Sequence, residues 1–117
     1  MRLSGPAIEL NASAAQTIGM AVHELATNAC KYGALSNDTG SILLDWSLDE
    51  SGEGLSFSIN WIERDGPSVT TPSRKGFGQI VLLRMAEDAL DAKVRLDYEP
   101  AGLRWNLKCS AENALKA

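Results

Sequence analysis

Hydrophobic residues recur at helical spacing in two segments of the chain. The first segment runs from about residue 13 to Leu35, and at about 100° per residue its apolar positions share one side of a helix. These core-facing positions are Ile18, Val22, Leu25, Ala29 and Tyr32. The Asn11-Ala12-Ser13 stretch is the candidate N-cap, with Gln16 placed after Ser13 as in a capping box. A second helix is predicted from Gln79 to Leu90, so we expect two long helices, each with a buried face.

Other segments alternate apolar and polar residues, which is typical of half-buried strands. They span residues 3–10, 41–48, 55–61, 93–99 and 103–109. Gly-containing turns join the second strand to the third as a hairpin, and the fourth to the fifth. Residues 110–117 are expected to be a frayed tail. The pattern predicts one α+β domain over residues 1–117, a two-layer sandwich whose mixed, mostly antiparallel sheet is covered by helices on one face.

Residues 64–78 show no periodicity and contain two Pro and three Gly, so we expect a long loop. The loop ends in Gly76-Phe77-Gly78 just before the second helix, with Arg74 and Lys75 beside it. Backbone N–H groups at a helix N-terminus attract anions, and glycine lets a phosphate approach the backbone closely. This is a candidate phosphate site, with an ordinary turn as the alternative.

Composition narrows the possible partners. The chain has 117 residues and a net charge of −4, which argues against nucleic-acid binding, since that function usually requires a basic patch. Cys30 and Cys109 are isolated thiols, which indicates a reducing, cytoplasmic setting. No apolar run approaches the roughly 18 residues of a transmembrane helix.

Polar residues on one edge of the first helix carry the candidate chemistry. Glu24, Asn28 and Lys31 fall within a sector of roughly 60° at helical spacing. A carboxylate can accept a proton, an amide oxygen can bind a hard cation, and an ammonium can neutralise phosphate. Together they would suit a metal–nucleotide complex. The alternative is a solvated helix face with a Glu–Lys pair.

A second candidate site lies at the end of the third strand, in Glu63-Arg64-Asp65-Gly66-Pro67. A carboxylate placed here can accept a hydrogen bond from an exocyclic amine such as that of adenine. The alternative is an ordinary Asp-Gly-Pro turn.

These motifs, taken in order, resemble a known family. Glu24-x-x-x-Asn28 resembles the N box of the Bergerat ATP-binding fold, which histidine kinases share with type II topoisomerases, the Hsp90 chaperone and MutL. The stretch from His23 to Leu35 and the Trp61-Ile62-Glu63 tripeptide resemble the His and Trp-x-Glu motifs of HWE-type bacterial sensor histidine kinases. The motifs span residues 23–78, and the order of elements fits the family's catalytic domain over nearly the whole chain.

The resemblance implies a role for each matching residue. Asn28 would hold Mg²⁺ at the phosphates of ATP, Glu24 would polarise or deprotonate the nucleophile, and Lys31 would contact phosphate. For His23 the resemblance leaves both an orienting or packing role and direct catalysis open. The remaining nucleotide contacts implied are Tyr32, Glu63, Asp65, Gly66, Arg74, Lys75, Gly76 and Gly78.

One position departs from the family pattern, which usually reads Glu-x-Gly-Gly-Pro. Asp65 stands where the first of these glycines would be, so either Glu63 or Asp65 would face the adenine.

The implied activity is transfer of the γ-phosphoryl group of Mg·ATP to a histidine, in two-component signalling. The single histidine of this chain, His23, lies inside the ATP motif, so the acceptor is expected on a separate dimerisation domain, with a response regulator as an indirect partner. The isolated domain is expected to be a monomer. The alternatives are a degenerate docking module for a response regulator, and an anti-sigma-type Ser/Thr kinase of the same fold.

Overall fold

The computed structural model describes residues 1–31, 33–35, 37–52, 54–66 and 81–116. It contains a sheet of five strands in the order β1-β2-β3-β5-β4. The strands are β1 (Arg2–Ser4), β2 (Ser41–Ser51), β3 (Gly54–Arg64), β4 (Lys93–Glu99) and β5 (Gly102–Ser110). The β1–β2 pair is parallel and the other pairs are antiparallel, which confirms the predicted mixed, mostly antiparallel sheet.

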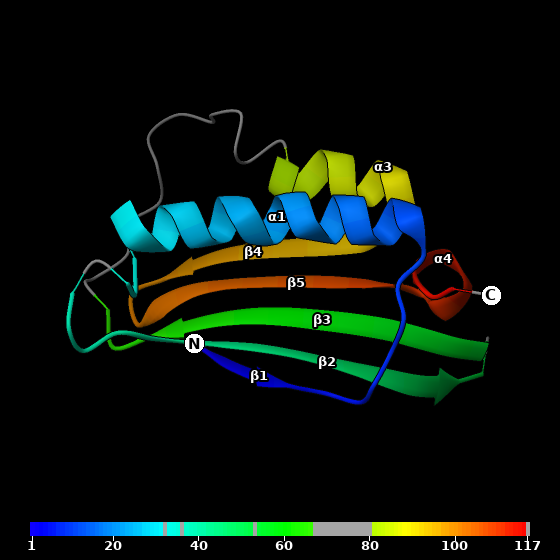
Figure 1. Ribbon diagram of the computed structural model, residues 1–117, viewed down its shortest axis with the longest axis horizontal. Coiled ribbons are helices and arrows are strands. Elements are labelled where there is room, and N and C mark those ends of the chain that lie inside the picture. The colour runs from blue at the N-terminus through cyan, green and yellow to red at the C-terminus, as the bar shows by residue number, and fades with distance from the viewer. Residues whose placement is uncertain (32, 36, 53, 67–80, 117) are drawn as a thin grey trace.

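Helices cover one face of this sheet, as Figure 1 shows. The helices are α1 (Ala12–Lys31), η1 (Val81–Met85), α3 (Ala86–Leu90) and α4 (Ala111–Ala114). The predicted second helix is found in its described part, although its first turn, η1, is π-helical. Gln79 and Ile80, where the prediction begins, lie outside the described residues. The α+β two-layer architecture is confirmed.

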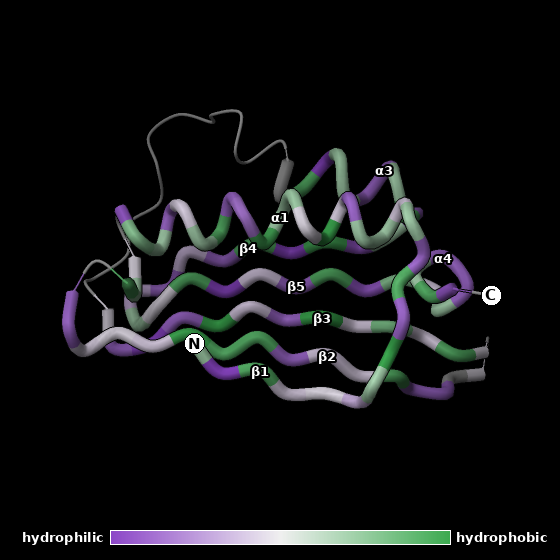
Figure 2. Tube along the Cα trace, in the orientation of Figure 1, coloured by the Kyte–Doolittle hydropathy of each residue, from purple (hydrophilic) through white to green (hydrophobic). Residues whose placement is uncertain are grey.

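The core lies between α1 and the inner face of the sheet. Ala14, Ile18, Ala21, Leu25 and Ala29 form the buried face of α1. Beneath them the fully buried rings of Trp61 and Trp105 lie opposite each other on β3 and β5. Figure 2 shows the alternation of hydrophobic and hydrophilic positions along the strands, which places apolar side chains under the helices and polar ones on the open face.

The ends of α1 differ from the prediction. Asn11 is the N-cap, because its side-chain oxygen accepts a hydrogen bond from the Ala14 amide at 2.8 Å, whereas Ser13 is exposed inside the first turn. At the other end α1 stops at Lys31, four residues before Leu35. The Leu35 amide reaches back to the Ala29 carbonyl at 3.0 Å, which closes the helix in a tight turn.

The prediction of a frayed tail at residues 110–117 is wrong for the described residues. The tail forms α4, in which Ala111 and Ala114 are buried. Its backbone also bonds to the start of α1, since the Asn11 amide donates to the Ala114 carbonyl at 2.8 Å. Burial and these hydrogen bonds together offset the entropy of ordering a short terminal segment.

Candidate functional site

The polar edge predicted for the first helix is present on α1. Glu24 and Asn28 are partly buried and Lys31 is exposed, while the neighbouring Leu25 and Ala29 are fully buried. Glu24 and Asn28 therefore lie on the border between the core face and solvent. Among the described residues no ion pair joins Glu24 to Lys31, so the simple alternative of a Glu–Lys surface pair is not what the structure has.

His23 is exposed on the adjacent position of α1. Its backbone carbonyl accepts a hydrogen bond from the Thr27 hydroxyl at 2.9 Å. Core packing is therefore not the role of this imidazole.

Glu63, at the end of β3, is the one buried charged side chain among the described residues, with 4% exposure. Its Oε1 accepts a hydrogen bond from the Ala34 amide at 2.8 Å, and its Oε2 accepts one from the Trp61 indole N–H at 2.9 Å. A buried carboxylate is costly unless it is hydrogen-bonded, and here each oxygen has a donor. Trp61 and Glu63 can meet because residues two apart on a strand share a face.

Glycines make room around Ala34, which lies just beyond the end of α1. A Cβ on Gly33 would overlap Glu63 Oε1, and a Cβ on Gly40 would overlap the Ala34 carbonyl oxygen. A Cβ on Gly66 would lie 2.7 Å from the Ala34 Cα. The turn after α1 and the end of β3 are therefore packed backbone to backbone, so the structure gives Gly66 a steric reason that does not depend on a ligand.

Asp65 differs from Glu63 in exposure and in backbone conformation. It is exposed, and its backbone is left-handed with φ of 60°. Its backbone carbonyl accepts a hydrogen bond from the Thr39 hydroxyl at 2.8 Å, which holds the β3 exit against the turn before β2.

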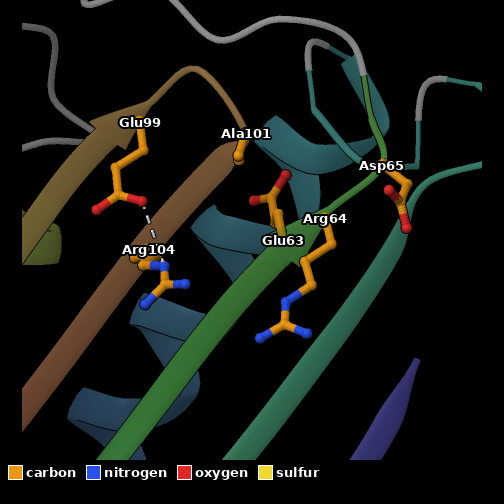
Figure 3. Close-up of a pocket in the computed structure, with 7 residues that line it drawn as sticks. Glu63, Arg64, Asp65, Glu99, Ala101 and Arg104 are labelled. Carbon is orange, nitrogen blue, oxygen red and sulfur yellow. Dashed lines mark ion pairs between the residues drawn. The ribbon is translucent and has the colours of Figure 1, made fainter.

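A pocket of about 200 Å³ opens at this end of the sheet. Figure 3 shows Glu63 and Arg64 leaving β3 in different directions, as alternation along a strand requires. Arg104 pairs with Glu99 at 3.5 Å, and both are about half exposed, so the pair contributes little stability. The pocket is lined by Glu63, Arg64, Asp65, Glu99, Ala101, Gly102 and Arg104. It joins the predicted residues Glu63 and Asp65 but includes none of Glu24, Asn28 and Lys31.

Several predicted site residues lie outside the described residues: Tyr32, Arg74, Lys75, Gly76 and Gly78. The predicted loop at residues 64–78 begins later than expected, because Arg64 is still part of β3. Sequence analysis missed Ala34, whose amide is the partner of Glu63. No pattern in the chain indicates that contact, because the two residues are far apart in sequence.

The side-chain oxygens on the polar edge of α1 suit a metal ion that is already bound to the phosphates of a nucleotide. Mg²⁺ usually keeps several waters and takes one or two protein oxygens plus phosphate oxygens. The Asn28 amide oxygen, on the partly buried edge of α1, is one such protein oxygen. No group of three or more His, Cys, Asp or Glu side chains that could hold a metal alone is found in the described ranges.

Known proteins with similar sequences point to one kind of enzyme. The chain is 38% identical over 103 residues to the blue-light-activated histidine kinase of Brucella anthropi, and that match covers 88% of this chain and 21% of the relative. The protein of the same description in Brucella ovis matches to the same extent. The chain thus spans about a fifth of the length of these curated relatives. No protein-family profile matches it.

Solved structures show the same fold. The histidine kinase domain of the Erythrobacter litoralis EL346 blue-light-activated kinase superposes with a TM-score of 0.70 at 15% identity, covering 95% of this chain and 51% of that one. This chain is similar in sequence to histidine kinases over 88% of its length, and it has the fold of their catalytic domains. The catalytic domain of the histidine kinase ThkA agrees, with a TM-score of 0.65 at 13% identity, covering 93% of this chain and 77% of that domain.

In the described part of the chain, no helix is both long and apolar enough to cross a membrane.

Proposed function

We propose that this domain binds Mg·ATP and transfers the γ-phosphoryl group to a histidine on a separate dimerisation domain, as a member of the HWE-type sensor kinases. The observation that carries the proposal is the polar edge of α1. A carboxylate and an amide stand one turn apart at the border of a buried helix face, within a chain similar to histidine kinases over 88% of its length.

The proposed roles follow from the chemistry of each group. Asn28 offers a neutral oxygen to Mg²⁺, which when bound neutralises charge on the phosphates. Glu24, one turn earlier, accepts or polarises the proton of the attacking imidazole. Lys31, exposed at the last turn, contacts phosphate. Phosphoryl transfer needs mainly such positioning and charge stabilisation, so a small set of groups is sufficient.

The base would be read at the end of β3. The exposed Asp65 carboxylate and the remaining lone pairs of Glu63 are the acceptors available to an exocyclic amine. We further propose that Tyr32, Arg74, Lys75, Gly76 and Gly78 complete the nucleotide contacts, on the strength of the sequence motifs alone.

Calorimetric titration with ADP and with ATP, each with Mg²⁺ and with EDTA, tests the proposal. We expect metal-dependent binding to a monomeric domain. Transfer from ATP to a histidine-bearing dimerisation segment should then give an acid-labile, base-stable phosphate. Absence of nucleotide binding would reject the proposal, and an acid-stable product would indicate a Ser/Thr kinase instead.

A further inference from the structure

The hydrogen bonds of Glu63 define what kind of side chain this position needs. Two fixed N–H donors, the Ala34 amide and the Trp61 indole, each address a different carboxylate oxygen. An ionised carboxylate is purely an acceptor and satisfies both donors. A carboxamide of the same size cannot, because its NH₂ would face one of the two N–H groups. The position therefore selects Glu over Gln on hydrogen-bonding grounds that involve no ligand.

Ala34 lies three residues after Lys31, the last residue of α1, and the amides on either side of it bond back to the helix. The Gly33 amide bonds the Asn28 and Ala29 carbonyls at 3.2 and 3.1 Å, and the Leu35 amide bonds the Ala29 carbonyl at 3.0 Å. Ala34 lies between these two amides. A constraint on Ala34 is therefore passed through the turn to the backbone of Asn28.

We propose that Glu63 is a positioning residue, which ties the sheet to the end of α1 and so sets the position of Asn28. We call Trp61, Glu63 and Ala34 the Glu63 clamp. The inference deepens the proposed function and rests on it for the role of Asn28. The clamp itself is a matter of geometry: its carboxylate is 4% exposed, its Trp61 ring is fully buried, and Gly33 leaves room for its oxygen.

Gly33→Ala gives a test that leaves the chemistry of the clamp unaltered. The added Cβ would overlap Glu63 Oε1 and force the carboxylate away from the Ala34 amide. Gly19→Ala, inside α1, is the control for adding a methyl group, because a Cβ there meets nothing within 4 Å. We expect Gly33→Ala to weaken Mg·ADP binding about tenfold, the loss typical of a hydrogen bond to a charged group, and Gly19→Ala to leave it unchanged.

Glu63→Gln and Trp61→Phe form a double-mutant cycle that separates positioning from simple loss of packing. Alone, Glu63→Gln should weaken Mg·ADP binding about tenfold and speed exchange of the Ala34 amide proton. Trp61→Phe removes the donor that the new carboxamide would oppose. The double variant should therefore recover part of both effects, with a coupling that independent sites would not show.

The Trp61 indole proton provides a readout that needs no nucleotide. In the wild type it bonds a carboxylate, so its NMR signal should lie downfield and should move in Glu63→Gln and in Gly33→Ala but not in Gly19→Ala. Trp61→Phe identifies the signal among those of the three tryptophans.

The two readouts keep the clamp distinct from the proposed function. If wild type binds no nucleotide while the indole and Ala34 signals behave as described, the clamp stands as geometry and the proposed function fails. If Glu63→Gln and Gly33→Ala fold and either keep wild-type Ala34 protection or keep wild-type Mg·ADP affinity, the positioning role is overturned. Weaker Mg·ADP binding with wild-type Ala34 protection would instead make Glu63 a direct contact to the base. If Glu63→Gln does not fold, Gly33→Ala against Gly19→Ala still decides the question.

Discussion

The two ends of α1 are fastened by different chemistry. At the N-terminal end, Asn11 accepts from the Ala14 amide at 2.8 Å, and its side chain donates to the Asn113 carbonyl at 2.9 Å. These capping groups are neutral and partly buried, where α1 and α4 meet. The charged groups nearby are the exposed Lys116 and Glu9, which pair at 3.3 Å between the segments that flank the two helices. At the C-terminal end the fastener is the buried carboxylate of Glu63, surrounded by glycines.

This difference indicates that the C-terminal end of α1 serves activity, whereas the N-terminal end serves only the stability of the fold. A neutral cap satisfies the unpaired N–H groups of a helix end without burying a charge. A buried charge requires full hydrogen bonding, and replacing such groups by apolar ones is often neutral or stabilising. A chain under selection for stability alone has little reason to place a carboxylate at the end that carries Asn28 and Lys31. We therefore expect substitutions at the C-terminal end to affect activity and those at the N-terminal end to affect stability.

The largest effect is expected at Glu24. Glu24→Gln keeps the size of the side chain but removes its basicity, so phosphotransfer should fall about 10²–10⁴-fold, the usual contribution of a general base. Nucleotide affinity should stay close to wild type. Phosphotransfer is measured with labelled ATP and a histidine-bearing dimerisation segment, and affinity by calorimetry.

Glu112→Gln is the matched control, an exposed glutamate on α4 near the opposite end of α1. It should leave both quantities unchanged. Parallel losses of binding and of rate in Glu24→Gln would show that Glu24 supports the fold rather than the reaction.

The next largest effect is expected at Asn28. Asn28→Ala removes the amide oxygen proposed for Mg²⁺, so affinity for Mg·ATP should fall roughly tenfold or more. In EDTA the variant and the wild type should bind ATP equally, since the lost contact is to the metal. Equal weakening with and without metal would assign Asn28 a direct contact to the nucleotide instead.

Sequence analysis identified the last four strands and both helices because each rests on a local pattern of alternation or helical spacing. The first strand, predicted over residues 3–10, ends at Ser4. Sequence analysis also placed the N-cap within Asn11-Ala12-Ser13, and Asn11 is the residue of that stretch that caps α1, rather than the Ser13 of the capping box. It missed α4, because burial of that short segment depends on packing against α1. The Glu63–Ala34 bond joins residues 29 apart in sequence, and no periodicity encodes such a contact.

Asn11→Ala tests the N-terminal end of α1. Loss of the cap should lower the free energy of unfolding by about 1 kcal/mol, measured by urea denaturation, while Mg·ADP affinity of the folded protein stays unchanged. Ser13→Ala, two residues later and exposed, should change stability by less than about 0.5 kcal/mol. Weaker Mg·ADP binding by folded Asn11→Ala would show that the N-terminal end of α1 also affects the nucleotide site, which contradicts the distinction between the two ends.

The smallest effect is expected in thiol labelling of the two free cysteines, which lie near the two ends of α1 and need no mutation. Cys30 is exposed in the last turns of α1, and Cys109 is buried in β5 just before α4. Burial raises the pKa of the Cys109 thiol, which lowers its reactive thiolate fraction, and burial also blocks access of the reagent. With a disulfide reagent such as DTNB, we expect Cys30 to react promptly in the native protein and Cys109 only after local or global opening.

Urea below the unfolding midpoint should accelerate the reaction of Cys109 selectively. Asn11→Ala should do the same, because the cap holds α4 over that end of the sheet. Mg·ADP should not slow Cys109 where local opening limits its reaction. If nucleotide protected Cys109 under those conditions, the two ends would open as one unit and the distinction between them would fail.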